Sequence, residues 1–253
     1  IKQGPSLWAG IPQSAGLKND LRLDSLCRRP AFRTLAQAEG RLYVSDSANN
    51  VIRRVNPGNA GKVETVAEGF KSPQGLAIDG RGNLWVADSG NHTIRRVNLA
   101  SGAVETIAGQ TGSPGSADGS GPAARFNFPI GVAIETETPA QALTRARRGD
   151  PPPPVNLIVA DSGNGAIRRV SETGQVDTLL VASVSALGVV GNDSSKSGKA
   201  GIADRTLSQL AAGNFNSPTG VAVDPLGNIY VTEAASGAVK TILNNGEVVL
   251  AVQ

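Results

Sequence analysis

The sequence of 253 residues has no methionine, one cysteine and one histidine, and aromatic residues make up only 4% of it. The lone Cys27 excludes an internal disulfide and lacks the partners of a zinc site. The lone His92 excludes a metal site built from several imidazoles. No apolar run approaches the roughly eighteen residues that would span a bilayer, so we predict no membrane span in this segment.

Charge of one sign is also scarce, because 24 basic residues face 21 acidic ones and leave a net charge of +3. That balance does not by itself predict nucleic-acid binding. The 31 glycines, together with apolar residues that are mostly Val, Ile, Leu and Ala, favour many short strands joined by tight turns. We expect a segment of a larger multidomain protein. Asn91 and Asn192 begin glycosylation sequons, and an extracellular or lumenal setting is preferred to the cytoplasm.

A repeated phrase dominates what is present. VADSGNHTIRRV at 86–97 recurs as VSDSANNVIRRV at 44–55 and VADSGNGAIRRV at 159–170, with a weaker copy, VTEAASGAVKTI, at 231–242. An apolar phrase containing glycine precedes most copies, and another strand-like phrase follows each. Four short strands in a unit of roughly forty residues are typical of a propeller blade.

These phrases resemble the NHL repeat family, whose units read roughly PxGVAVDxxGNIYVADxxNHRIRxV. The resemblance implies an all-β protein, a β-propeller built from four-stranded antiparallel blades. The family usually closes with six blades, so the four blades here are expected to be part of a larger ring. One propeller domain, 1–253, is predicted, with blades at about 29–70, 71–109, 126–181 and 215–253, an extra N-terminal outer strand at 6–10 and an insert at 135–154.

The repeated polar residues have a structural interpretation. Asp46, Asp88 and Asp161 end strands, where a carboxylate can accept backbone N–H groups and fix the turn. At least one arginine of each Arg-Arg pair is expected to need a carboxylate or carbonyl partner, because both faces of a blade are covered by its neighbours, and we expect the strand-end aspartates to supply some of these partners. The arginines given this structural role are Arg54, Arg96 and Arg169, each the second of its pair. A ring of arginines that binds phosphates is the alternative.

Asp88, Ser89 and His92 stand close enough in sequence to suggest a catalytic triad. The aspartate and serine recur in the other copies, however, and only the histidine is singular, so we predict no catalytic, cofactor-binding or metal-binding residue. Asp118, Asp193 and Asp204 lack the spacing of a calcium loop and are interpreted as turn residues. The glycine-rich segment 112–121 is expected to be a flexible linker between blades.

The insert between the first two strands of the third blade is the most distinctive feature outside the repeat. It is interpreted either as a solvated loop with a polyproline II stretch or as an arm that docks a partner. The predicted partner-binding residues are Arg145, Arg147, Arg148, Pro151, Pro152, Pro153 and Pro154.

The function predicted from these features is a non-catalytic scaffold that binds or assembles proteins. The resemblance leaves RNA binding open as an alternative. A metal-dependent hydrolase or lyase is a further alternative, which would need Asp79 or Asp224 to hold an ion on the propeller axis.

Overall fold

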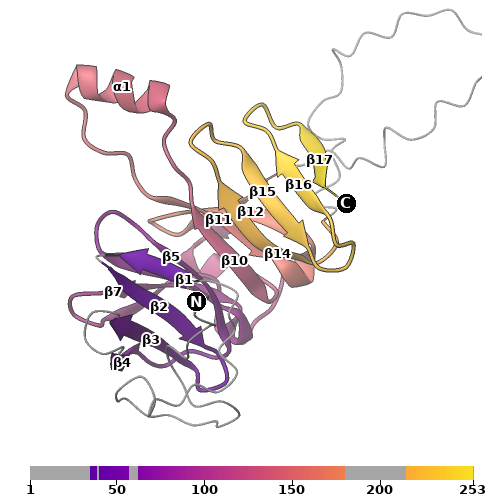
Figure 1. Ribbon diagram of the computed structural model, residues 1–253. Helices are drawn as coiled ribbons and strands as arrows, with labels where there is room; N and C mark the ends of the chain where they lie inside the picture. The colour runs from indigo at the N-terminus through magenta and orange to yellow at the C-terminus, as the bar shows by residue number, and fades with distance from the viewer. Residues whose placement is uncertain (1–34, 39, 57–61, 180–214, 253) are drawn as a thin grey trace, which may run out of the picture.

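The computed structural model describes residues 35–38, 40–56, 62–179 and 215–252 (Figure 1). The expected outer strand at 6–10 and most of the linkers 10–29 and 181–216 lie outside this part of the chain. The described strands form four antiparallel sheets, which we number as blades 1 to 4. Blade 1 comprises β1 (Leu35–Ala38), β2 (Arg41–Asp46), β3 (Val51–Asn56) and β4 (Lys62–Ala67). Blade 2 comprises β5 (Pro73–Ile78), β6 (Asn83–Asp88), β7 (Thr93–Asn98) and β8 (Val104–Ala108).

Blade 3 has a fifth strand, which comes from the linker ahead of it. It comprises β10 (Pro129–Ile134), β11 (Asn156–Asp161), β12 (Ala166–Ser171), β13 (Gln175–Thr178) and the added β9 (Gly119–Ser120). Blade 4 comprises β14 (Pro218–Val223), β15 (Ile229–Glu233), β16 (Val239–Ile242) and β17 (Val248–Val252). The predicted all-β, four-stranded blade architecture is confirmed, and the sheets do not close into a ring.

Each sheet is a meander whose strands pair with their neighbours in sequence. In blade 2, Leu84 lies opposite Val97 and Asp88 opposite Thr93, so the Asp-Ser-Gly-Asn phrase closes the hairpin between β6 and β7. Short 3-10 turns fill that hairpin in blade 2 (η1, Ser89–Asn91) and blade 3 (η3, Ser162–Asn164). A third 3-10 turn, η2 (Gly121–Ala123), follows β9. All the hairpins between second and third strands therefore lie at one end of the blades, and the insert leaves from the other.

The second strand of each blade supplies both sides of the blade-to-blade core, because alternate side chains point to opposite faces. At each interface, one residue of this strand shares a core cluster with two alternate residues of the next blade's second strand. The three interfaces are Tyr43 with Leu84 and Val86, Trp85 with Leu157 and Val159, and Ile158 with Ile229 and Val231.

The innermost strands approach closely at the glycine of the Pro-x-Gly phrase in blades 2 and 3. A Cβ added to Gly75 would lie 2.2 Å from the carbonyl oxygen of Ile130, and one added to Gly131 would lie 2.6 Å from that of Thr219. Real Cβ atoms do not come so near a backbone oxygen. Glycine at this position therefore allows successive innermost strands to pack backbone against backbone.

Two elements depart from the expectations drawn from sequence. The segment 112–121 contains β9, which pairs with β13, in place of a purely flexible linker. The insert contains an α-helix, α1 (Pro139–Arg148), ahead of its proline run. Thr138 caps α1 through a capping box with Gln141, and Gly149 ends the helix in a left-handed conformation.

Candidate functional site

The strand-end carboxylates join each turn to the segment that enters the blade. Asp88 Oδ1 accepts the backbone N–H of Lys71 at 2.7 Å, and its Oδ2 accepts the side-chain amide of Asn91 at 2.8 Å. Asp161 accepts the equivalent pair of bonds from Asn127 and Asn164. Burial raises the pKa of Asp88 and of Asp161, and these hydrogen bonds oppose the rise. The carboxylate thus accepts a backbone N–H group, as predicted, but from the segment ahead of the innermost strand. Its bond within the turn comes from an asparagine side chain.

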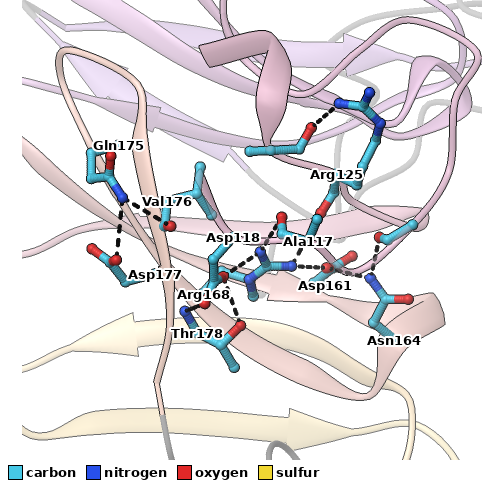
Figure 2. Close-up of polar contacts among 12 residues, drawn as sticks. Ala117, Asp118, Arg125, Asp161, Asn164, Arg168, Gln175, Val176, Asp177 and Thr178 are labelled. Atoms are coloured by element: carbon cyan, nitrogen blue, oxygen red, sulfur yellow. Dashed lines mark hydrogen bonds and ion pairs between the residues drawn. The ribbon is translucent and has the colours of Figure 1, made fainter. Parts of the chain in front are cut away.

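Figure 2 shows the arginine of blade 3 that completes this network. Arg168 is fully buried and donates to Asp161 Oδ2 at 3.0 Å and to Asp118 Oδ1 at 2.6 Å. Its guanidinium carbon lies 5.3 Å from the centre of the Phe126 ring. Asp118 also accepts the backbone N–H and the hydroxyl of Thr178. Asp118 thus fastens the linker to the blade, as the interpretation of it as a structural residue expected; Asp193 and Asp204 lie outside the described residues.

The first residue of each basic pair contacts the strand-end carboxylate. Those ion pairs are Arg53 to Asp46 at 3.2 Å, Arg95 to Asp88 at 3.4 Å and Lys240 to Glu233 at 2.8 Å. Arg54, Arg96 and Arg169, which the sequence prediction chose, bind other carboxylates: Glu64, Glu105 and Glu135. Hydrogen bonds from Lys62 and Arg54 lower the pKa of Glu64 to about 2. The strand-end carboxylate thus meets the first arginine of a pair, because strand alternation sends the second arginine to the opposite face.

The three residues that suggested a triad each engage a different backbone group. Ser89 donates its hydroxyl to the carbonyl of Pro129, and His92 Nδ1 accepts the backbone N–H of Phe128 at 3.1 Å. Burial, with a smaller effect of the Lys71 charge, lowers the pKa of His92. Ser89 and His92 thus link the turn of blade 2 to the segment that enters blade 3.

The acids at the ends of the innermost strands organise turns in the same way. Asp79 Oδ1 accepts two backbone N–H groups of its own turn, and Oδ2 accepts from Asn83 and from Trp85 Nε1 at 3.0 Å. Asp224 repeats this arrangement with Asn228 and with the hydroxyl of Tyr230 at 3.2 Å. Hydrogen bonds lower the pKa of Asp224, those from Asn228 most strongly. Within the described residues, no three His, Cys, Asp or Glu side chains gather as a metal-binding group.

The insert forms an arm, defined as residues 135–154, whose two limbs are held at the base. On the outgoing limb, Glu135 pairs with Arg169 at 2.7 Å and the Thr136 hydroxyl donates to the carbonyl of Asp224 at 3.2 Å. On the returning limb, Arg81 of blade 2 donates to the carbonyl of Pro153 at 2.9 Å and pairs with Glu172. The base of the arm therefore bridges blades 2, 3 and 4.

The helix of the arm projects away from the sheets and has no buried residue (Figure 1). Arg145 folds back onto Glu137, with its Nε 3.1 Å from both carboxylate oxygens. Arg147 and Arg148 are exposed and make no hydrogen bond or ion pair with the described residues. The structure thus separates the predicted trio into one residue that holds the arm and two that point to solvent. Pro151 to Pro154 are exposed, and the last two border the groove described next.

A groove of about 840 Å³ lies at the base of the arm, between blades 3 and 4. Its polar wall comes from the arm and from Arg169, and its apolar lining includes Pro154, Leu226 and Leu243. Leu226 is 60% exposed. The lining of the groove mixes these apolar residues with polar side chains such as Glu135 and Asn156.

Sequence reasoning missed the aromatic partners of the cations that contact the strand-end carboxylates. Phe70, Phe126 and Phe215 lie under Arg95, Arg168 and Lys240, at 5.1 to 5.4 Å from ring centre to charged group. Each phenylalanine stands three residues before the proline that begins a blade. That spacing was a usable signal. Of the helical segments in the described part of the chain, none has the length and apolar character that crossing a membrane requires.

Comparison with known proteins identifies the repeat. The NHL repeat profile matches residues 70–97 and 215–240, which lie in blades 2 and 4. No curated protein matches the sequence. A virginiamycin B lyase from Staphylococcus aureus shares the fold at a TM-score of 0.54 and 12% identity, over 87% of this chain and 55% of the lyase.

Two other solved structures show the same relation. An auxiliary nutrient binding protein from Bacteroides ovatus aligns at a TM-score of 0.57 and 18% identity, over 85% of this chain and 47% of that protein. Kuenenia stuttgartiensis hydrazine synthase aligns at 0.53 and 13%, over 96% of this chain and 53% of the synthase chain. The chain thus spans about half the length of these proteins. Two units of the chain thus match the NHL repeat, and its four antiparallel blades share the β-propeller fold of these structures.

Proposed function

We propose that this propeller segment is a non-catalytic scaffold, and that it binds an acidic protein partner through the arm. The observation that supports this most is the combination of a fixed base and a free tip. The base is held by three blades, whereas Arg147 and Arg148 at the end of α1 have no partner among the described residues. An anchored helix loses little conformational freedom on binding, which favours affinity.

The charge of the tip indicates the chemistry of the partner. Three arginines lie in the last turn of α1, where they also complement the negative end of the helix dipole. Arg145 is neutralised by Glu137, so the net positive charge that a partner would meet comes from Arg147 and Arg148. A glutamate- or aspartate-rich protein segment fits this surface, with the groove beside Pro154 available to its apolar residues.

The contacts of the acids and of Ser89 support the non-catalytic part of the proposal. The carboxylate oxygens of Asp79 and Asp224 accept hydrogen bonds from donors in their own blades, and the Ser89 hydroxyl donates to the carbonyl of Pro129. A hydrolase of propeller fold would need such groups turned toward a substrate.

Fluorescence anisotropy with a short glutamate-rich peptide tests the proposal. We expect Arg147→Glu to weaken binding by about tenfold, and the double reversal with Arg148→Glu to weaken it further. Lys71→Glu is the matched control, because it makes the same charge change at an exposed site on blade 2. Equal affinities for wild type and the double variant would remove the arm from the function. Tight binding of single-stranded RNA with a steep salt dependence, without peptide binding, would favour the RNA alternative.

A further inference from the structure

We infer that the outer face of blade 4 binds blade 1 of a second copy of this chain, so that two copies close one ring. The outer face of blade 4 is defined here as the side that carries Gly220, Ala222, Tyr230 and Thr232. These residues lie opposite one another in the register of β14 and β15, Ala222 against Tyr230 and Gly220 against Thr232. The inference is independent of the arm and of its proposed partner.

Tyr230 occupies the position that packs against the next blade in the other three units. Its equivalents Tyr43, Trp85 and Ile158 are 2%, 0% and 0% exposed, whereas Tyr230 is 38% exposed. Ala222 and Thr232 are also exposed, although Ala77 and Ala87, their counterparts in blade 2, are buried. Blade 4 therefore presents the apolar half of a blade interface without its other half.

The surroundings of Gly220 show that the innermost strand of blade 4 also lacks a neighbour. The neighbours that a Cβ would meet at Gly75 and Gly131 belong to the backbone of the next blade. At Gly220 the three nearest atoms all belong to Thr232, in its own blade. The space that another innermost strand fills in blades 2 and 3 is thus open at blade 4.

The tyrosine is already held in the orientation that the interface uses. Its hydroxyl lies 3.2 Å from Asp224 Oδ2, and Trp85 Nε1 lies 3.0 Å from Asp79 Oδ2 in the equivalent bond. That hydrogen bond raises the pKa of Tyr230, so the ring stays neutral at physiological pH. Binding would need no rearrangement of this side chain.

A second copy carries the complementary half. In each of the three described interfaces, the residue equivalent to Tyr230 shares a core cluster with two alternate residues of the next second strand. In blade 1 those residues are Leu42 and Val44, which are only half-buried, whereas Leu84, Val86, Leu157 and Val159 are fully buried. We therefore place Tyr230 of one copy between Leu42 and Val44 of the other.

Symmetry supports a pair of copies over a longer array. A contact between two different surfaces closes when each copy uses both, and two copies would then share two identical interfaces. Two copies supply eight of the described blades, so the ring would be larger than the six-bladed one that the family resemblance implies.

Sedimentation velocity of the full chain over a dilution series tests the inference. We expect a reversible dimer, and we expect Tyr230→Lys and Leu42→Asp each to raise its dissociation constant by about tenfold or more. An equal mixture of the two variants should regain dimer, because one of its interfaces pairs lysine with aspartate and the other is wild type. Arg147→Glu is the control and should leave the dimer unchanged.

Three results would overturn the inference. They are a monomer at every concentration, open-ended assembly in place of a dimer, and a dimer that survives Tyr230→Lys. Circular dichroism of each variant establishes that the blades remain folded. Ala222→Lys, at another exposed position of the outer face, repeats the test if Tyr230→Lys perturbs the fold.

Discussion

At the scale of single residues, one turn position shows how a repeat keeps a bond while changing the side chain that makes it. Asn50 ends the turn of blade 1 and accepts the backbone N–H of Ser72 through its side-chain oxygen at 2.7 Å. His92 ends the turn of blade 2 and accepts the N–H of Phe128 through Nδ1. Both residues adopt a positive φ of 60°. The histidine that looked catalytic is therefore a second acceptor for the same link between blades.

This exchange predicts a pH dependence that belongs to His92. Because the folded pKa lies below the usual value near 6.5, the unfolded chain binds the proton first as the pH falls. Stability from this residue is therefore fully present above the unfolded pKa and falls as the pH drops toward the folded pKa. Below the folded pKa the hydrogen bond itself is lost, since protonated Nδ1 cannot accept. We expect the free energy of unfolding to fall by about 1 kcal/mol between pH 7.5 and 5.5 from this residue.

His92→Asn is the informative variant, because it restores the acceptor found in blade 1 and does not titrate. Urea denaturation at the two pH values should show a smaller pH effect in the variant than in the wild type. Since His92 is the only histidine of the chain, no other imidazole contributes to the difference. Equal pH effects in the two proteins would contradict the assignment.

Residues whose contacts lie close in sequence could be identified from the sequence, and residues whose partners lie far away in the chain could not. The turn role of Asp88 and Asp161 was predictable, since it depends on the repeat itself. The burial of Arg168 in place of Arg169 was not, because it depends on which face of β12 meets Phe126 and Asp118. Those partners come from the linker, some forty to fifty residues away in the chain.

At the scale of elements, the strands were predictable and the two irregular segments were not. Period-two apolar phrases bounded by glycine and asparagine predicted the four strands of each unit. The helix α1 has a local signal, the Thr-Pro-x-Gln capping box before Ala, Leu and Arg. The proline run that follows favours polyproline II, and the prediction for the insert was based on that run alone. β9 has only two residues and depends on Asp118 for its position, so no local pattern reveals it.

The close approach of innermost strands gives a prediction for Gly131. In Gly131→Ala the new methyl group would lie 2.6 Å from the carbonyl oxygen of Thr219, so β10 and β14 must separate. We expect a loss of about 1 to 3 kcal/mol in the free energy of unfolding, measured by urea denaturation. Gly80→Ala is the control, because no atom lies within 4 Å of its added Cβ. The same loss in both variants would contradict a role for close backbone packing.

At the scale of the whole molecule, the blades form a row in which each contacts only its neighbours. β5 packs against β1 and β10, and β10 packs against β5 and β14, so blades 2 and 3 have a neighbour on both faces. Among the described residues, blade 4 is covered by blade 3 alone. In such an array, stability is a sum of blade terms and interface terms, and a blade with one interface is the first to open.

This arrangement predicts unequal hydrogen exchange along the chain. In dilute protein, we expect amides of β15 to exchange about tenfold or more faster than those of β6 and β11, because Tyr230 lacks the cover that Trp85 and Ile158 have. Exchange monitored by mass spectrometry on peptides from the three strands provides the comparison. The protection of β15 should rise with chain concentration in the wild type and stay constant in Tyr230→Lys, since only the wild type gains the second copy. Uniform protection of β6, β11 and β15 at low concentration would show that blade 4 is as well supported as its neighbours, and would contradict a free face on that blade.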